Sequence, residues 1–452
     1  MTIALYIGLV LLGVLVAVLL LIGVLDVVRG TPIRSVGLPG DEGGPAISDP
    51  FFREAIELMT EIKLTPGNDV EVLINGDQTY DRLWADLRSA RTSITMQMYY
   101  CNSGKMADEL HRILDDRARA GVDVYFLFDS FGTTLPREYF ESLRLAGVHT
   151  TPFRPVSLNT FHKAQHRAHI RVVVVDGKIG YTGGFGIDDK WYGNGRQPDQ
   201  WRDSNVRFTG PAVRQLQATF VVCWAEASGR LLTSERLFPL VAEGNGREPR
   251  RTDGESAQAV AARSPPDGDG VLAAVLHASP TIGSTEAERF FVLSIAAARE
   301  KLYIANSYFV PDKAFRKFLC DAAKRGVDVR ILTTSKQTDV KSTWYAGRAR
   351  YEELMKGGVR IYEYQPAMMH AKTIVVDGMW MSVGSMNADN RSMSFNEESN
   401  LVVFDKATAE NMEKFFLEDL EYSEEINAEE FAKRPLTAKI AESACHLVWR
   451  VL

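Results

Sequence analysis

The stretch "HAKTIVVDG" at residues 370–378 joins a strand to two polar side chains that a buried strand does not need. Ile-Val-Val is typical of a buried strand, and Asp-Gly is typical of the turn that ends it. His370 and Lys372 are two residues apart, so both side chains lie on one face of the strand. A strand edge with solvated polar ends would explain one such segment, whereas a second copy at a matching place would indicate chemistry.

A second copy exists, because three segments of the first half of the chain recur in the second half at offsets of 201 to 211 residues. The pairs are "HIRVVVVDGKIGYTGG" (169–184) with "HAKTIVVDGMWMSVGS" (370–385), "RAGVDVYFLFD" (119–129) with "KRGVDVRILTT" (324–334), and "LAGVHTTPFRP" (145–155) with "KGGVRIYEYQP" (356–366). Two copies indicate one duplicated unit, since an array needs at least three repeats.

Each copy alternates helical and strand patterns, which predicts an α/β fold. We expect two pseudo-symmetric halves, each a mixed sheet flanked by helices, at residues 56–242 and 271–425. The Gly- and Pro-containing stretch 243–270 is typical of a flexible connector. Residues 426–452 have a helical pattern and are predicted to pack on the body, with membrane contact as the alternative.

The N-terminal segment is apolar and carries no charge from Ile3 to Leu25. As a helix it would span about 35 Å, enough for a hydrocarbon core of about 30 Å. A cleaved signal peptide would have a shorter apolar region and small residues at a cleavage site. We therefore expect a single transmembrane anchor at 1–28, followed by a linker at 29–55. Arg29 and Arg34 follow the helix, and this favours a cytoplasmic body.

The net charge argues against a nucleic-acid binder, and the one histidine-rich segment argues against a metal site. The net charge is −6 and the pI is about 5.9, whereas a general nucleic-acid binder has a basic excess. The segment "HKAQHRAH" (162–169) invites a metal site through its three histidines, but no Cys or carboxylate completes it locally. Lys163 and Arg167 instead offer a basic approach for an anionic group, with a solvated loop as the alternative.

The two copies supply matching sets of a histidine, a cation and an aspartate. The sets are His169, Arg171, Asp176 and His370, Lys372, Asp377. A pseudo-twofold axis would bring the two sets face to face. Histidine can act as a nucleophile or as an acid and base, and paired cations stabilise a phosphoryl group. The pattern predicts metal-free phosphoryl transfer by double displacement, with the two aspartates anchoring their strand ends.

The motif H-x-K-x4-D, present twice, resembles the phospholipase D superfamily over roughly residues 60–425. The second motif continues "VGSMNADNRS", in which Ser385 and Asn387 match the Gly-Ser-x-Asn extension of the superfamily. "NEESNL" puts Glu398 where the superfamily places a carboxylate against a catalytic imidazole, and Asp203 of "WRDSNV" takes that place in the first copy. The resemblance implies that these two carboxylates orient the imidazoles.

Within the superfamily the chain is most similar to bacterial cardiolipin synthases, through "SYFVPD" (307–312), residues 334–364 and "GGFGIDDKWYG" (183–193). Many of those enzymes carry two N-terminal membrane helices, and this chain shows one. The first copy departs from the motif, with Arg171 for Lys and Gly186 for Asn. Arginine keeps the charge but differs from lysine in reach and shape.

The resemblance implies an enzyme of a bacterial inner membrane that makes cardiolipin and glycerol from two phosphatidylglycerol molecules. The expected intermediate is a phosphatidyl-histidine, with His169 as the nucleophile by analogy and without metal or other cofactor. The expected partners are the phospholipid membrane and phosphatidylglycerol, not nucleic acid, and the oligomeric state is left open. The alternatives are a lipid hydrolase that releases phosphatidic acid, a nuclease, and a lipid-binding scaffold with a decayed site.

Overall fold

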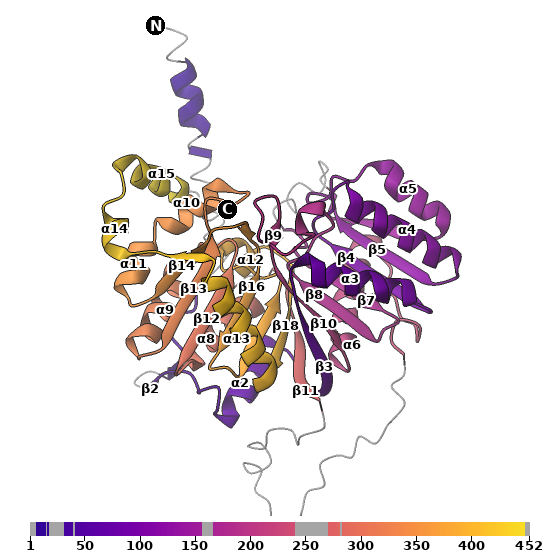
Figure 1. Cartoon of the computed structure of the whole chain (residues 1–452), viewed down its shortest axis with the longest axis horizontal. Coiled ribbons are helices and arrows are strands. Elements are labelled where there is room, and N and C mark those ends of the chain that lie inside the picture. The colour runs from indigo at the N-terminus through magenta and orange to yellow at the C-terminus, as the bar shows by residue number, and fades with distance from the viewer. Residues whose placement is uncertain are drawn as a thin grey trace, which may run out of the picture.

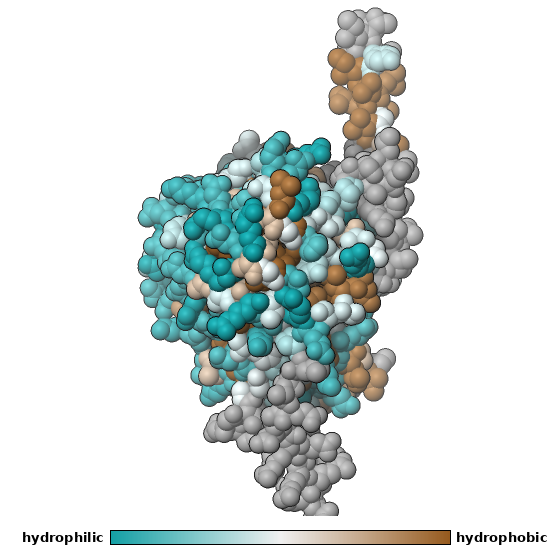
Figure 2. Space-filling view, turned by 90° about the vertical axis from the view of Figure 1, so that its right-hand side faces the viewer, coloured by the Kyte–Doolittle hydropathy of each residue, from teal (hydrophilic) through white to brown (hydrophobic). Residues whose placement is uncertain are grey.

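The computed structural model describes residues 6–14, 16–17, 31–38, 41–155, 166–239, 270–280 and 283–447. Most of the predicted anchor 1–28, and the predicted connector 243–270 apart from Gly270, lie outside these residues. Residues 6–14 are helical, and their large apolar side chains are exposed (Figure 2). Within the described ranges, no helix is both long enough and apolar enough to cross a membrane.

A 15-stranded mixed sheet runs through both halves of the molecule (Figure 1). From the centre outward, the first half contributes β3 (Thr65–Ile74), β10 (Ser204–Thr209), β8 (Ile179–Gly183), β7 (Val172–Val175), β4 (Ser93–Met98), β5 (Asp123–Asp129) and β6 (His149–Phe153). The second half contributes β11 (Val271–Ala278), β18 (Glu398–Phe404), β17 (Trp380–Gly384), β16 (Lys372–Val376), β12 (Lys301–Asn306), β13 (Asp328–Thr334), β14 (Arg360–Tyr364) and β19 (Ser423–Glu425).

Counted outward from the centre of the sheet, equivalent strands follow in the same order in the two halves. The halves join where β3 pairs with β11. In each half three strands are parallel, β4–β5–β6 and β12–β13–β14, and the others pair antiparallel. The predicted α/β class is confirmed, but the two halves share one mixed sheet, joined by β3 and β11, instead of each having a sheet of its own. The repeated strand order agrees with the duplication seen in the sequence.

Helices cover both faces of this sheet. They are α2 (Pro50–Thr60), α3 (Asn75–Ser89), α4 (Lys105–Arg119), α5 (Arg137–Ala146), α6 (Ala212–Ser228), α8 (Glu286–Ala297), α9 (Lys313–Lys324), α10 (Lys341–Arg348), α11 (Tyr351–Lys356), α12 (Asn390–Ser394), α13 (Lys406–Leu420), α14 (Ala428–Ala432) and α15 (Leu436–Leu447). Two strands, β1 (Gly37–Leu38) and β2 (Asp41–Glu42), form a separate hairpin before α2.

Alternation along the motif strands divides the core into layers. In β7, Val173 and Val175 pack with α3, α4 and α5, whereas Val172 and Val174 point to the opposite face and pack with α6. In β16, Ile374 faces the layer that contains α8 and α9. Burying one such side chain fully is worth roughly 1.5–3 kcal/mol. This two-sided burial holds both motif strands, and therefore the histidines before them, in fixed positions.

Two terminal segments pack on the second half. Helix α2 crosses the predicted boundary between the linker 29–55 and the first half, and it packs against α8. Its Phe52 ring meets Trp380 edge to face, with ring centroids 5.3 Å apart. At the other end, α15 packs against α10, and Arg350 Nε donates to His446 Nε2 over 2.9 Å. The predicted packing of the tail on the body is confirmed for its described residues.

Candidate active site

His169 and His370 come from different halves and face one pocket. Each lies just before its motif strand, β7 or β16, and only 7% and 3% of their surfaces are exposed. Both line a cavity of about 280 Å³. The expectation that a pseudo-twofold arrangement brings the two histidines together therefore agrees with the geometry.

Two short pairings between the halves place a carboxylate beside each histidine. Strand β9 (Trp201–Arg202) pairs parallel with β15 (Met368–Met369), so the residues that follow, Asp203 and His370, lie side by side. A single parallel β-bridge joins Ala168 to Glu397, so the residues that follow them, His169 and Glu398, also lie side by side. Each histidine is thus served by the carboxylate of the other half.

The resulting hydrogen bonds fix both imidazole rings. His169 Nδ1 lies 3.1 Å from both carboxylate oxygens of Glu398, and His370 Nδ1 lies 2.8 Å from Asp203 Oδ2. A carboxylate at Nδ1 holds the ring in place and leaves Nε2 available for chemistry. The sequence predicted these two carboxylates but did not specify that the pairs would cross between the halves.

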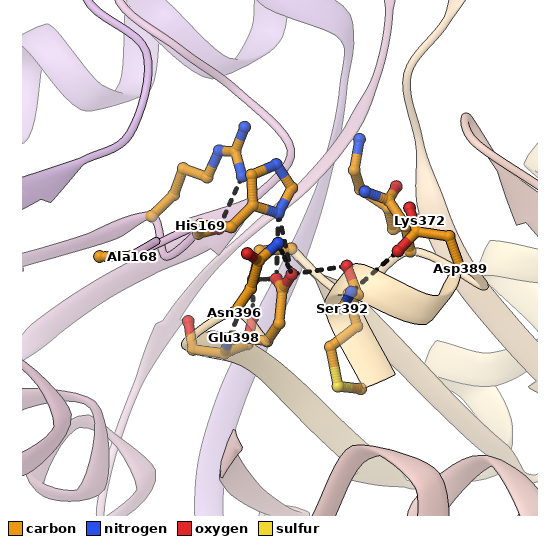
Figure 3. Close-up of polar contacts among 12 residues, drawn as sticks. Ala168, His169, Lys372, Asp389, Ser392, Asn396 and Glu398 are labelled. Atoms are coloured by element: carbon orange, nitrogen blue, oxygen red, sulfur yellow. Dashed lines mark hydrogen bonds and ion pairs between the residues drawn. The ribbon is translucent and has the colours of Figure 1, made fainter. Parts of the chain in front are cut away.

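Glu398 is held by a ring of donors from the second half (Figure 3). Ser385 Oγ donates to its Oε2 over 2.5 Å, and Ser392 Oγ donates to its Oε1 over 2.6 Å. Asn396 Nδ2 adds a longer bond of 3.4 Å. Ser385 was predicted to belong to the site, whereas Ser392 and Asn396 were not, although they lie in the quoted stretches "VGSMNADNRS" and "NEESNL".

Asp203 has a different environment, made by the first half. The indole N–H of Trp191 donates to Asp203 Oδ2 over 2.9 Å, and the backbone N–H of Ser204 donates to Oδ1 over 2.8 Å. The Trp191 and Trp201 rings also pack against His370, with centroids 5.3 and 4.7 Å from the imidazole. The two carboxylates therefore differ in their donors: Asp203 is held by an indole N–H and a backbone N–H, whereas Glu398 is held by hydroxyl and amide groups of side chains.

The two cations occupy equivalent places beside the histidines. Lys372 Nζ donates to the carbonyl oxygen of His370 over 2.6 Å, and Arg171 Nη1 donates to that of His169 over 2.7 Å. Both residues are buried, each with 1% of its surface exposed. Arg171 thus takes the position of the lysine that the motif expects.

Burial and the paired cations shift the ionisation of the whole cluster. Burial, followed by the charges of Arg171 and Lys372, lowers the pKa of both histidines well below the ordinary value. Burial lowers the pKa of Lys372 to about 7 and raises that of Glu398 to about 8. A bound phosphodiester anion would offset the cations and favour a protonated imidazole. The cluster is therefore electrostatically suited to an anion.

Asp176 and Asp377 lie at the far ends of the motif strands and do not line the pocket. Asp176 accepts hydrogen bonds from the backbone N–H groups of residues 91–93, and Asp377 accepts them from residues 299–301. Each aspartate thus ties its motif strand to the start of the neighbouring strand, β4 or β12. This agrees with the anchoring role expected for them.

The Gly186 departure has a structural explanation. A Cβ atom at Gly186 would lie 2.7 Å from the ring of Trp191, so the indole occupies the space that a side chain would need. In the second half, Asn387 Oδ1 instead accepts a hydrogen bond from Ser307 Oγ over 3.1 Å. The side chain absent at position 186 is therefore replaced by the tryptophan that holds Asp203.

The histidine-rich segment 162–169 does not assemble a metal site in the described part of the chain. His162 and Lys163 lie outside the described residues, and His166 Nδ1 is 3.0 Å from the carbonyl oxygen of Phe395. Arg167 is buried, with its Nη1 3.8 Å from Asp129, rather than exposed as a basic approach. No group of His, Cys, Asp or Glu able to hold a metal ion occurs among the described residues.

Comparisons with known proteins agree with this site. A family model described as "Cardiolipin synthase, PLD-like domain" matches residues 83–224 and 292–420. A cardiolipin synthase of Geobacillus kaustophilus is 34% identical over 407 residues, which cover 88% of this chain and 76% of that protein. Cardiolipin synthase A of Pseudomonas fluorescens is 34% identical over 366 residues, covering 80% and 71% of the two chains.

A solved structure shows the same fold. Phosphatidylserine synthase from Haemophilus influenzae aligns with a TM-score of 0.64 at 12% identity, over 89% of this chain and 99% of that one. The family model matches segments of both halves that contain both histidine motifs and the two carboxylates Asp203 and Glu398. On this evidence the chain belongs to the cardiolipin synthase family of the phospholipase D superfamily.

Proposed function

We propose that this protein is a membrane phosphatidyltransferase that makes cardiolipin and glycerol from two phosphatidylglycerol molecules through a phosphatidyl-histidine. The carrying observation is the pair of imidazoles from two halves, which line one pocket, are each held at Nδ1 by a carboxylate and lie beside two buried cations. Membership of the cardiolipin synthase family supports the product.

In the first step, His169 Nε2 attacks the phosphorus of one phosphatidylglycerol. An N–P bond forms and the bond from phosphorus to the glycerol oxygen breaks. His370, protonated at Nε2, gives its proton to the leaving alkoxide, so that glycerol departs neutral. The choice of His169 as nucleophile rests on family analogy, and Glu398 would stabilise the positive charge that its ring gains.

In the second step, His370 takes the proton from a hydroxyl group of a second phosphatidylglycerol. That oxygen attacks phosphorus, the N–P bond breaks, and cardiolipin leaves with His169 restored. Arg171 would bind the phosphoryl oxygens throughout, because it borders the pocket, and the buried charge of Lys372 beside His370 would stabilise them. Ser385 would act one step back, through Glu398, whereas Asn387 borders the pocket itself and accepts a hydrogen bond from Ser307.

Transfer to a lipid hydroxyl requires that water compete poorly for the intermediate. Five aromatic side chains border the pocket, at Tyr99, Tyr100, Trp191, Trp201 and Tyr308. Polar residues, among them Asp339 and Arg391, share the lining, so the preference rests on the anchor, which would expose the intermediate to lipid headgroups at high local concentration. This proximity favours the synthase over the hydrolase.

The segment 1–28 would anchor the enzyme in the bacterial cell membrane as a single-pass helix, with Arg29 and Arg34 keeping the body cytoplasmic. Exposed apolar side chains at residues 6–14 support this, since none of them packs on the described body. The body would then consist of two phospholipase D-like halves, 56–242 and 271–425, joined by the connector 243–270.

The test is incubation of the purified full chain with vesicles of labelled phosphatidylglycerol, with identification of the products by mass. We expect cardiolipin and glycerol in equal amounts, phosphatidic acid as a minor product, and reversal on addition of glycerol. Phosphatidic acid without cardiolipin would establish the hydrolase instead. Absence of both products would indicate the decayed scaffold.

A further inference from the structure

The two half-sites differ at one position that the motif does not include. Strands β4 and β12 hold equivalent places beside β7 and β16, with Ile94 opposite Val175 and Leu302 opposite Val376. Counting five residues on from Ile94 and Leu302 reaches the first residue after each strand, which is Tyr99 in the first half and Ser307 in the second. An aromatic ring thus stands where the other half has a hydroxyl group.

In the second half this hydroxyl group belongs to a chain of hydrogen bonds. Lys372 Nζ donates to Ser307 Oγ over 2.7 Å, and Ser307 Oγ donates to Asn387 Oδ1 over 3.1 Å. A lysine ammonium group is a compact point charge whose donors suit a single oxygen. Ser307 therefore fixes the direction of Lys372 by hydrogen bonding.

In the first half the cation is contacted by the aromatic ring of Tyr99 and not by a serine hydroxyl group. The guanidinium carbon of Arg171 lies 5.6 Å from the centroid of the Tyr99 ring. The same ring meets the imidazole of His169 edge to face at 5.0 Å. A planar guanidinium group packs well on an aromatic face, whereas an ammonium group has no flat surface to match it. Tyr99 thus contacts both the histidine and the cation of its half-site.

The hydrogen bonds of Arg171 show what this packing leaves available. Its Nη1 and Nε donate to the carbonyl oxygens of His169 and Phe185. Its Nη2 makes no hydrogen bond to any residue that the structure describes, and Arg171 borders the pocket. Two carbonyl oxygens and the Tyr99 ring hold the guanidinium group, and Nη2 is left to bind a phosphoryl oxygen.

We infer that Tyr99 is a positioning residue of the first half-site, whose ring holds Arg171 and His169 as one unit, and that Tyr99 and Arg171 replace Ser307 and Lys372 as a matched pair. The inference rests on the proposed role of Arg171 at the phosphoryl group. It follows that exchanging one member of the pair does more harm than exchanging both, because Lys needs the hydroxyl and Arg needs the ring.

The test is a double-mutant cycle with Tyr99→Ser, Arg171→Lys and the combination, in the full chain on phosphatidylglycerol vesicles. Glycerol release is measured, since it reports cleavage whether the acceptor is a lipid or water. We expect each single change to lower kcat/KM about tenfold, with kcat and KM each shifting about threefold, and the pair to lose about tenfold rather than about a hundredfold. Tyr99→Phe keeps the ring and should retain activity within about twofold.

Two controls separate positioning from loss of fold. Tyr99→Leu fills the space without a π face and should be as poor as Tyr99→Ser while its Tm stays near that of the parent. Tyr362→Ser removes a ring that lies 5.4 Å from Arg360 at the far edge of the sheet, and it should leave kcat unchanged. Losses that multiply in the double variant, or Tyr99→Phe behaving like Tyr99→Ser, would overturn the inference.

A binding measurement keeps the inference separate from the proposed reaction. Calorimetry with glycerophosphoglycerol, the soluble phosphodiester headgroup, needs no turnover. We expect Tyr99→Ser and Arg171→Lys each to weaken binding several-fold and the pair to weaken it no further. If the parent binds this headgroup but releases no glycerol from vesicles, the proposed function fails while the cycle in binding still decides the role of Tyr99.

Discussion

Replacing Glu398 by glutamine tests the crossed pairing of carboxylates and histidines. The change is isosteric and leaves the side chain fully buried among the same neighbours. Glutamine keeps one oxygen that can accept from His169 Nδ1, while the hydroxyl groups of Ser385 and Ser392 can turn to accept from its amide. What the change removes is the negative charge that Glu398, whose pKa burial raises to about 8, can carry once the ring of His169 becomes positive.

The size of the effect follows from the distance. His169 Nδ1 lies 3.1 Å from the carboxylate oxygens, so a charge spread over the imidazole lies about 4 Å away. At an effective dielectric constant of about 20, that pair interacts by about 4 kcal/mol. The ring gains this positive charge only when it is bonded to phosphorus. We therefore expect Glu398→Gln to lower kcat by about 10³-fold.

The assay is exchange of labelled glycerol into phosphatidylglycerol, which requires the first step and its reverse only. The adjacent Glu397 supplies a matched control, because its side chain meets His277 and Arg154 and does not line the pocket. Glu397→Gln should therefore lower Tm while leaving the exchange rate per folded molecule close to that of the parent. Since His169 and Glu398 act as a unit, His169→Ala combined with Glu398→Gln should exchange no more slowly than His169→Ala alone.

The counterpart change, Asp203→Asn, shows whether the pairs cross as described. It should impair His370, the proposed acid and base, and so slow both steps. Exchange in Glu398→Gln at more than a third of the parent rate, with normal Tm, would refute the reasoning. So would a further large loss on adding Glu398→Gln to His169→Ala.

Four further outcomes are expected. His370→Ala should lower turnover by at least the roughly 10²–10⁴-fold that acid–base assistance supplies, and full activity would end the two-histidine model. The full chain should sediment with membranes and deletion of residues 1–28 should release much of it, whereas a fully soluble parent would disprove the anchor. Although partial burial opposes it, hydrogen bonds from the N–H groups of residues 91–93 lower the pKa of Asp176. The contribution of ionised Asp176 to stability is therefore present above the unfolded pKa of 3.8 and is lost as pH falls through the lower folded value. Asp176→Asn should lower the free energy of unfolding by about 1–3 kcal/mol in denaturant at pH 7, and by less in acid. Turnover per folded molecule should be retained. Because burial lowers the pKa of Lys372 to about 7, kcat/KM should fall as pH rises above that value, and an unchanged alkaline limb in Lys372→Arg would assign the limb to another group.

Much of the fold was predictable because it is written in contiguous residues. The strands expected around residues 122–129 and 327–334 appear as β5 and β13, since their β-branched and aromatic runs suit a buried sheet. The helices before them appear as α4 and α9, where helical spacing is followed by a glycine stop at Gly121 and Gly326. The duplication was equally visible, because a repeat is a property of the sequence itself.

The contents of the site were predictable as residue types but not as partners. His169, His370 and the two carboxylates were identified, and the spacing of each motif placed its cation on the same strand face. Which carboxylate serves which histidine could not be predicted, because Asp203 and His370 are 167 residues apart and meet through the pairing of β9 with β15. A strand of two residues carries too little pattern for sequence reasoning to detect.

The sequence by itself therefore determined the α/β class, the duplication, the two motifs and the identity of the charged groups, since each depends on local periodicity or on the likeness of one segment to another. Only the tertiary structure decided that the carboxylates cross between the halves, that Trp191 fills the space beside Gly186, and that Tyr99 stands where the other half has Ser307. The reason is that each of these depends on the distance between side chains from separate strands, which long-range pairing sets and no stretch of sequence contains.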